Sequence, residues 1–206
     1  MACQKADCDC VAFVASKLIS RQFVGRCVTC GHGHTDEHDV AHVAANNNDS
    51  VPCAIGQHRV FLSNIVAASN AKLLREHGIT HIVCCCPGAF SFASSAGKPL
   101  DREQGFVRLD LAMEDSSNQV LAEHTDAAFR FIEEALAANA DARVLVHCAQ
   151  GVSRSTSVVV DWLMRKHGLS YDEALQLCKK TRPIAQPNTA FERQLRQVER
   201  AARNDE

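Results

Sequence analysis

The sequence has no large excess of charge of either sign. Its 206 residues include 22 Lys and Arg and 24 Asp and Glu, so the formal net charge is only −2. Nucleic acids and anionic membranes attract proteins largely through excess positive charge. The balanced composition therefore argues against binding to either by bulk electrostatics, and we expect no nucleic-acid partner.

Long apolar segments are also missing. A helix needs about 20 mostly apolar residues to span a membrane, whereas the longest apolar stretch near the start, residues 11–19, is interrupted by Ser16 and Lys17. Asp7 and Asp9 precede this stretch, which makes it a poor secretory signal. We therefore expect a protein without a membrane span that resides inside the cell, in the cytoplasm or the nucleus.

Cysteine, in contrast, is abundant. The chain has 11 cysteines, an odd number, beside 46% hydrophobic and 22% charged residues. This composition excludes wholesale disorder. Because no secretion signal is apparent, a framework of disulfides is the weaker interpretation. Three other roles are possible for the cysteines: metal binding, redox chemistry and a single catalytic thiol.

The chain divides into two regions at about residue 50. Residues 1–50 form an extension rich in Cys and His, and they end in the polar run 46–50, which is typical of a linker. Within this extension, the pair Cys27 and Cys30 and the pair His38 and His42 together offer four ligands of zinc type. The seven residues between the two pairs are fewer than in usual zinc fingers, and His32 and His34 compete as ligands. A flexible His-rich tail is the alternative.

Residues 51–203 alternate short apolar runs with amphipathic ones. We predict strands at residues 60–62, 80–85, 106–111 and 144–146, and helices at residues 70–77, 120–139 and 155–167. A long loop is expected at 87–105, and Ser170 with Glu173 and Thr189 with Glu192 resemble capping boxes of two further helices. This order predicts an α/β fold, a three-layer sandwich with a central, mostly parallel sheet flanked by helices.

The segment that carries chemistry runs from His147 to Ser155, between an apolar strand and a predicted helix. A loop at this position can direct several backbone N–H groups at an anion, with the helix dipole behind them. Five residues separate Cys148 from Arg154, enough for a cup with the sulfur at its floor and the guanidinium at its rim. The field that binds an anion also favours a thiolate. We call residues 148–154 the anion loop.

The pattern His-Cys-x-x-Gly-x-x-Arg-Ser at residues 147–155 resembles the signature of cysteine-dependent protein phosphatases. Residues from about 51 to 202 are similar to the small atypical dual-specificity phosphatases, with supporting matches at 61–63, 78–83, 144–148, 162–164, 182–183 and 187–188. The chain departs from the family at Asp161-Trp162, where we expect altered helix packing and unchanged chemistry.

The resemblance implies a role for each residue of the signature. Cys148 attacks phosphorus, Arg154 binds the phosphoryl oxygens, and Ser155 stabilises the departing thiolate. His147 orients the loop. Phosphate also binds to the backbone amides of the loop interior, Ala149, Gln150, Gly151, Val152 and Ser153. No cofactor and no active-site metal are implied.

A general acid is expected on a separate loop upstream of the signature. The family position corresponds to residues 111–116, where we favour Asp115, with Asp110 and Glu114 as competitors. Further along the chain, Asn188 is expected to cap the last helix or to tie the anion loop in place.

Three consecutive cysteines, residues 84–86, lie at the end of the strand predicted at residues 80–85. Strand alternation places Cys84 and Cys86 on one face. Cys86, or less favourably Cys84, could trap oxidised Cys148 as a disulfide. The alternative is that both are small apolar core residues.

The substrate class follows from the uncharged interior of the anion loop. Phosphoinositide phosphatases of the superfamily tend to carry lysines there, so the resemblance implies a phosphorylated protein substrate, with phosphotyrosine and phosphoserine or phosphothreonine both accessible. Two alternatives remain: a phosphatase of lipid, RNA or glycan phosphates, and a catalytically silent phosphoprotein-binding module. The sequence does not indicate an oligomeric state.

Overall fold

A five-stranded sheet forms the centre of the protein, which a computed structural model describes over residues 50–87 and 100–204. The spatial order is β1-β2-β5-β3-β4, with β1 antiparallel to β2 and the other three pairings parallel. The strands are β1 (Cys53–Ala54), β2 (Val60–Asn64), β3 (His81–Cys84), β4 (Val107–Asp110) and β5 (Val144–Cys148). The predicted mostly parallel sheet is thus confirmed.

Both faces of the sheet are buried, so its central strands are mostly apolar. Leu145 and Phe61 point to one face, where they pack with Ile82 and Phe106. The alternate residues of the same strands belong to a larger core on the other face, together with side chains from the long helices.

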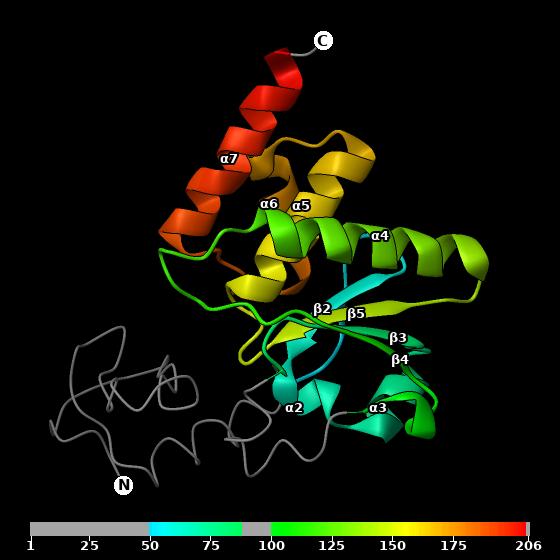
Figure 1. Cartoon of the computed structure of the whole chain (residues 1–206). Helices are drawn as coiled ribbons and strands as arrows, with labels where there is room; N and C mark the ends of the chain where they lie inside the picture. Colours follow the sequence, from blue (N-terminus) through cyan, green and yellow to red (C-terminus); the bar gives the residue numbers. More distant parts are fainter. Residues whose placement is uncertain (1–49, 88–99, 205–206) are drawn as a thin grey trace, which may run out of the picture.

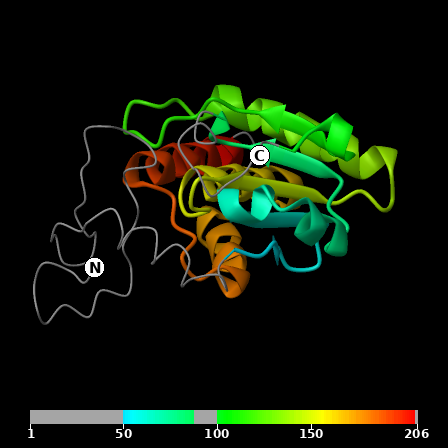
Figure 2. The ribbon, with the colours of Figure 1, turned by 90° about the horizontal axis from the view of Figure 1, so that it is seen from below.

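Helices cover each face (Figures 1 and 2). The long helices α4 to α7 lie on one side, where α5 contacts β2 and β5, and α4, α6 and α7 pack against α5. The short helices α2 and α3 lie on the other side. The bounds are α2 (Ile65–Ala68), α3 (Ala71–Glu76), α4 (Ala122–Ala138), α5 (Arg154–His167), α6 (Tyr171–Thr181) and α7 (Thr189–Asn204). The three-layer α/β fold is the predicted one, and none of the described helices is long and apolar enough to be a membrane span.

Helix boundaries follow local chemistry in most places. The side chain of Asn70 caps α3, and Gly168 ends α5 with a φ of 64°. The Ser170–Glu173 capping box at α6 is present. The capping box predicted for Thr189 and Glu192 was wrong.

At α7 the cap is Asn188. Its Oδ1 accepts hydrogen bonds from the backbone N–H groups of Ala190 at 3.0 Å and Phe191 at 2.9 Å. Glu192 instead accepts a hydrogen bond from Arg196. The predicted long loop at 87–105 also required a correction, because it contains a short 3-10 helix, η4 (Arg102–Gln104); residues 88–99 lie outside the described part.

Candidate active site

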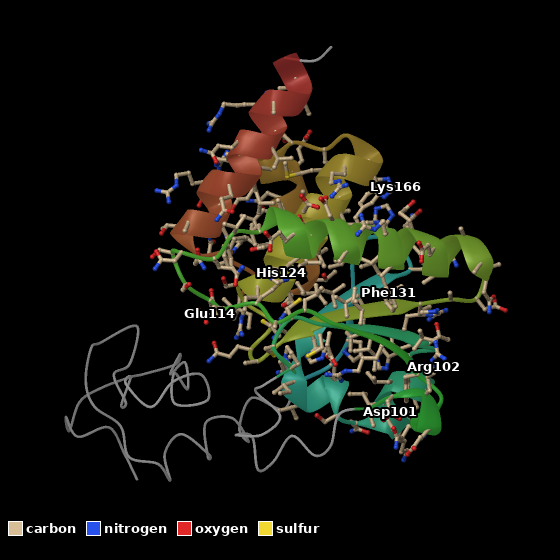
Figure 3. All side chains as sticks on the ribbon, in the orientation of Figure 1. Asp101, Arg102, Glu114, His124, Phe131 and Lys166 are labelled. Atoms are coloured by element: carbon tan, nitrogen blue, oxygen red, sulfur yellow. The ribbon has the colours of Figure 1, made fainter. Side chains whose placement is uncertain are left out.

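Strand β5 and helix α5 present the anion loop at the carboxyl ends of the parallel strands, the usual position for a ligand site in such a sheet. β5 ends at Cys148, two residues beyond the predicted strand 144–146, and α5 begins at Arg154, one residue before the predicted start at 155. In Figure 3 the loop after β4, marked by Glu114, lies at this end of the sheet, whereas Asp101 and Arg102 mark the opposite end.

Four consecutive carbonyl groups of the anion loop, at residues 149–152, accept hydrogen bonds from partners outside it. Ile65 N–H donates to the carbonyl of Ala149 at 3.2 Å, and Gln186 N–H donates to that of Val152 at 2.8 Å. Arg182 donates to two more, from Nη2 to Gln150 at 2.7 Å and from Nε to Gly151 at 2.7 Å. Since each carbonyl is turned outward, the N–H groups between them can point into the loop. This is the arrangement that an anion requires.

Gly151 makes this turn possible. Its φ of 68° lies in the left-handed region, which side chains disfavour. A Cβ at this position would also lie 2.4 Å from the carbonyl oxygen of Ser63 and 2.9 Å from Nε of Arg182. Glycine is therefore required both by the backbone conformation and by the close approach of β2.

The sulfur of Cys148 accepts two hydrogen bonds at the floor of the loop. One comes from the backbone N–H of Gly151 and the other from the hydroxyl of Ser155, each at 3.2 Å. Both donors stabilise negative charge on sulfur. The structure therefore brings Cys148 and Ser155 together as the sequence predicted.

Arg154 is 4% exposed and connects the anion loop to the segment after β4. Its Nη1 donates to the carbonyl of Met113 at 3.3 Å, and its Nε lies 3.8 Å from Oδ2 of Asp115. We call residues 111–121, between β4 and α4, the acid loop. Asp115 is its closest link to the anion loop, because its Oδ1 also accepts a hydrogen bond from the Ser153 hydroxyl at 2.7 Å.

The three candidate acids occupy different environments. Asp110 is on edge strand β4 and forms an ion pair with Arg108 at 2.7 Å. Glu114 is exposed, and its backbone N–H donates to the side-chain oxygen of Gln119 at 3.0 Å. Asp115 alone among these three contacts the anion loop, so the geometry favours the predicted choice.

Arg182 and Asn188 support the site from the two ends of the segment between α6 and α7. Besides capping α7, Asn188 donates from Nδ2 to Oδ1 of Asp115 at 2.8 Å, and its backbone N–H donates to the Ser153 hydroxyl at 3.1 Å. Both alternatives predicted for Asn188, helix cap and tie to the loop, are thus confirmed. The contacts of Arg182 with the loop carbonyls were missed, and the only sequence signal was its place in the family-like segment at 182–183.

The remaining predicted residues lie behind the loop or outside the described part. His147 is fully buried, with Nδ1 3.4 Å from the carbonyl oxygen of Cys148. The zinc candidates Cys27, Cys30, His38 and His42 all lie outside the described residues.

Cys84 and Cys86 share one face, as predicted, and their thiols are hydrogen-bonded to each other. This bond lowers the pKa of Cys84 and raises that of Cys86. Burial, with a contribution from the neighbouring Cys148, raises the pKa of Cys85. Disulfide protection of Cys148 by Cys86 or Cys84 stays a prediction.

Comparison with known proteins agrees with this geometry. The family model described as dual specificity phosphatase, catalytic domain, matches residues 60–201. "Dual specificity protein phosphatase 1" of Arabidopsis thaliana is 36% identical over 154 residues, which cover 75% of this chain and 72% of the relative.

Solved structures show the same fold. The crystal structure of human DUSP28 matches with a TM-score of 0.63 and 28% identity, covering 74% of this chain and 95% of that one. The human tyrosine phosphatase-like serine/threonine/tyrosine-interacting protein matches with a TM-score of 0.64 and 28% identity, covering 74% of this chain and 98% of that one.

The family model covers the strand that delivers the cysteine, the loop that surrounds its sulfur and the three helices that follow. The match extends over more than half of the sequence and includes both the anion loop and the acid loop. This chain therefore belongs to the atypical dual-specificity phosphatases of the cysteine-dependent protein tyrosine phosphatase superfamily, as the sequence predicted.

Proposed function

We propose that this protein hydrolyses phosphotyrosine and phosphoserine or phosphothreonine in protein substrates through a phosphocysteine intermediate, with Cys148 as the nucleophile. The observation that supports this most strongly is the environment of the Cys148 sulfur, which accepts hydrogen bonds from Gly151 N–H and Ser155 Oγ inside a loop whose carbonyls are turned outward. Such a loop provides both an anion-binding site and a stabilised thiolate.

In the first step the Cys148 sulfur attacks phosphorus while the bond from phosphorus to the leaving oxygen breaks. Protonated Asp115 gives its proton to that oxygen. The loop amides and Arg154 bind the three equatorial oxygens over which negative charge is spread. Arg154 is well placed for this because its Nη1 and Nε already lie at the boundary between the anion loop and Asp115.

In the second step Asp115 takes a proton from water, the water oxygen bonds to phosphorus, and the bond from phosphorus to sulfur breaks. The electron pair returns to Cys148, where the Ser155 hydroxyl donates to the sulfur at 3.2 Å and stabilises the thiolate that leaves. Inorganic phosphate is released and Asp115 is protonated again. No metal takes part in either step.

The substrate assignment rests on the chemistry of the loop interior. Between Cys148 and Arg154 the loop carries no Lys or Arg side chain that could bind a second phosphate group. The proposal places the protein in the cytoplasm or the nucleus, where thiols remain reduced.

Turnover of a small aryl phosphate by the wild-type chain and by Cys148→Ser tests this function. We expect release of phosphate by the wild type and loss of all measurable turnover in the variant, with Cys178→Ser as a control at a distant buried cysteine. Phosphopeptides are then compared with phosphoinositides. Faster turnover of phosphoinositides would contradict the protein substrate, and an inactive wild type would indicate a binding module.

A further inference from the structure

A second cluster of reactive side chains lies behind the anion loop. Among the described residues, Cys84, Cys86 and His147 bring one potential metal ligand each to within 4.8 Å of one another. All three residues are buried, with exposed fractions of 0%, 4% and 0%. The proposed catalytic steps use neither thiol. We call this group the thiol–imidazole cluster.

Strand register explains why the three side chains meet. Cys84 is the partner of His147 in the parallel pairing of β3 with β5, so both side chains project from the same face of the sheet. Cys86 follows two residues later and returns to that face. Cys148 comes directly after His147 and projects from the other face. His147 and the nucleophile are thus adjacent in sequence and alternate across β5, while Cys84, Cys86 and Cys148 all border the same buried core.

The donor set matches a thiophilic metal ion. Two cysteines and one histidine bind zinc in known proteins, with a water molecule in the fourth position. Bonds of about 2.3 Å to sulfur and about 2.0 Å to nitrogen, arranged tetrahedrally, put the ligand atoms about 3.5 to 3.8 Å apart. Because the three atoms already lie within 4.8 Å of one another, modest side-chain movements would bring them to these distances.

Charge also fits a divalent ion in this buried position. Two thiolates and one neutral imidazole balance the two positive charges of Zn²⁺, so the complex is neutral and avoids the large cost of burying a net charge. Formation of two zinc–sulfur bonds from two thiols releases two protons to solvent, while the imidazole contributes a lone pair and no proton. No electron transfer is involved.

We propose that Cys84, Cys86 and His147 form a binding site for a single Zn²⁺ ion at the rear of the anion loop. The site uses neither the nucleophile Cys148 nor the candidate ligands predicted at residues 27–42.

Occupancy of this site slows phosphatase turnover, a consequence that rests on the proposed function. The metal pulls the His147 side chain toward β3, and His147 is directly bonded to Cys148. The backbone here is also held from β3, because Cys85 N–H donates to the His147 carbonyl at 2.8 Å. A displacement of the nucleophile approaching 1 Å costs about 10²-fold in rate.

Zinc stoichiometry tests the site without reference to activity. The background is the full chain carrying Cys148→Ser, so that zinc bound by the nucleophile is not counted. Competition with a colorimetric chelator measures bound Zn²⁺ per chain in this background and after addition of Cys84→Ser and Cys86→Ser. We expect the background to bind one more zinc ion per chain, and equal stoichiometry would overturn the proposal.

Two matched variants control for folding and specificity. Cys178→Ser changes a buried cysteine on α6 outside the cluster and should keep the full stoichiometry. If the double variant does not fold, the zinc stoichiometry of Cys86→Ser alone tests the site, because this change removes one ligand just after the end of β3. Zinc should raise the Tm of the background and raise that of Cys86→Ser by much less; an equal rise in both would contradict the site.

Inhibition is measured with Cys148 intact. Zinc should inhibit the wild type at a concentration at least about tenfold lower than Cys86→Ser, and EDTA should restore both. Equal sensitivity would overturn the catalytic consequence. If the wild type hydrolyses no aryl phosphate even with EDTA, the proposed function fails, whereas zinc binding by the Cys148→Ser background still decides the metal site.

Discussion

The anion loop and the acid loop face each other across the site, but they are held in different ways. In the anion loop, neighbouring elements bind one carbonyl after another, and Ser153 and Arg154 are buried. The acid loop is mostly exposed and is held largely by side chains. The side-chain amide of Gln194 forms hydrogen bonds with the backbone of Leu121 and Gln119, and Asp115 accepts one from Ser153. We infer from this contrast that the phosphate site is held more firmly than the backbone of the acid loop.

Gly151→Ala should distort the firmly held anion loop and cause the largest loss of phosphatase activity. The added Cβ meets the Ser63 carbonyl at 2.4 Å, so the loop must move. We expect kcat/KM for an aryl phosphate to fall by about 10²-fold or more. Gly168→Ala is the matched control, because its φ is also positive, at 64°, but nothing lies within 4 Å of a Cβ there. Similar losses of activity in the two variants would show that general strain is responsible.

Asp115→Asn should affect the acid loop, and the loss of turnover should be smaller and should depend on the leaving group of the substrate. An amide cannot deliver the proton, so we expect kcat to fall about 10²-fold for a poor leaving group and less for a good one such as nitrophenolate. Glu114→Gln, one residue away and exposed, is the control and should stay close to wild type. Equal losses for both leaving groups would argue that Asp115 only holds the loops together.

Arg182→Lys should loosen the anion loop without changing any side chain inside it, and so tests what holds that loop. Lysine cannot reproduce the two donors, Nε and Nη2, that bind the carbonyls of Gly151 and Gln150. We expect inhibition by orthovanadate to weaken about tenfold, in line with the loss of one hydrogen bond to a group in the site. The control is Arg196→Lys at a surface ion pair. Unchanged vanadate affinity would mean that the carbonyls do not need Arg182.

Asp161→Asn should leave turnover unchanged and alter only stability. Burial raises the pKa of Asp161 from 3.8 to about 6, against the opposing effect of Arg165. The folded protein therefore binds more protons than the unfolded chain between these values, and Asp161 reduces stability as pH rises through that window. At pH 7.5 the variant should be more stable by up to about 3 kcal/mol, and at pH 4 nearly equal.

Denaturant unfolding at several pH values measures this difference. Parallel stability curves for the wild type and Asp161→Asn would contradict the assignment. Activity of the variant, assayed at pH 7.5, is the accompanying check that α5 has kept its position beneath the anion loop.

Local sequence was sufficient for the elements whose chemistry is local. The anion loop could be predicted because its nucleophile, glycine and arginine lie within seven residues between a strand and a helix. Helix α2, with four residues, is too short for a recognisable periodicity. The contacts of Arg182 could not be predicted, because they depend on how the end of α6 packs some 30 residues after the loop.

The choice of cap at α7 shows the same limit. Asn188 and Thr189 are adjacent residues of good capping type, and the sequence predicted a capping role for both, that of Thr189 through the acidic residue at 192. Tertiary structure selects Asn188, since its side chain also meets Asp115. The identity of the acid was ambiguous for a related reason: three carboxylates occur within six residues, and only the fold brings one of them to the loop.

Asn188 has a single amide whose two ends have different tasks: Oδ1 starts α7 while Nδ2 holds the carboxylate of Asp115. The group cannot rotate by half a turn, because its oxygen would then face that carboxylate and its NH₂ would face the N–H groups of the helix. Unwinding of the first turn of α7 and release of the acid are thus thermodynamically linked. Any partner that tightens the start of this terminal helix would also restrain proton delivery at the opposite end of the same amide.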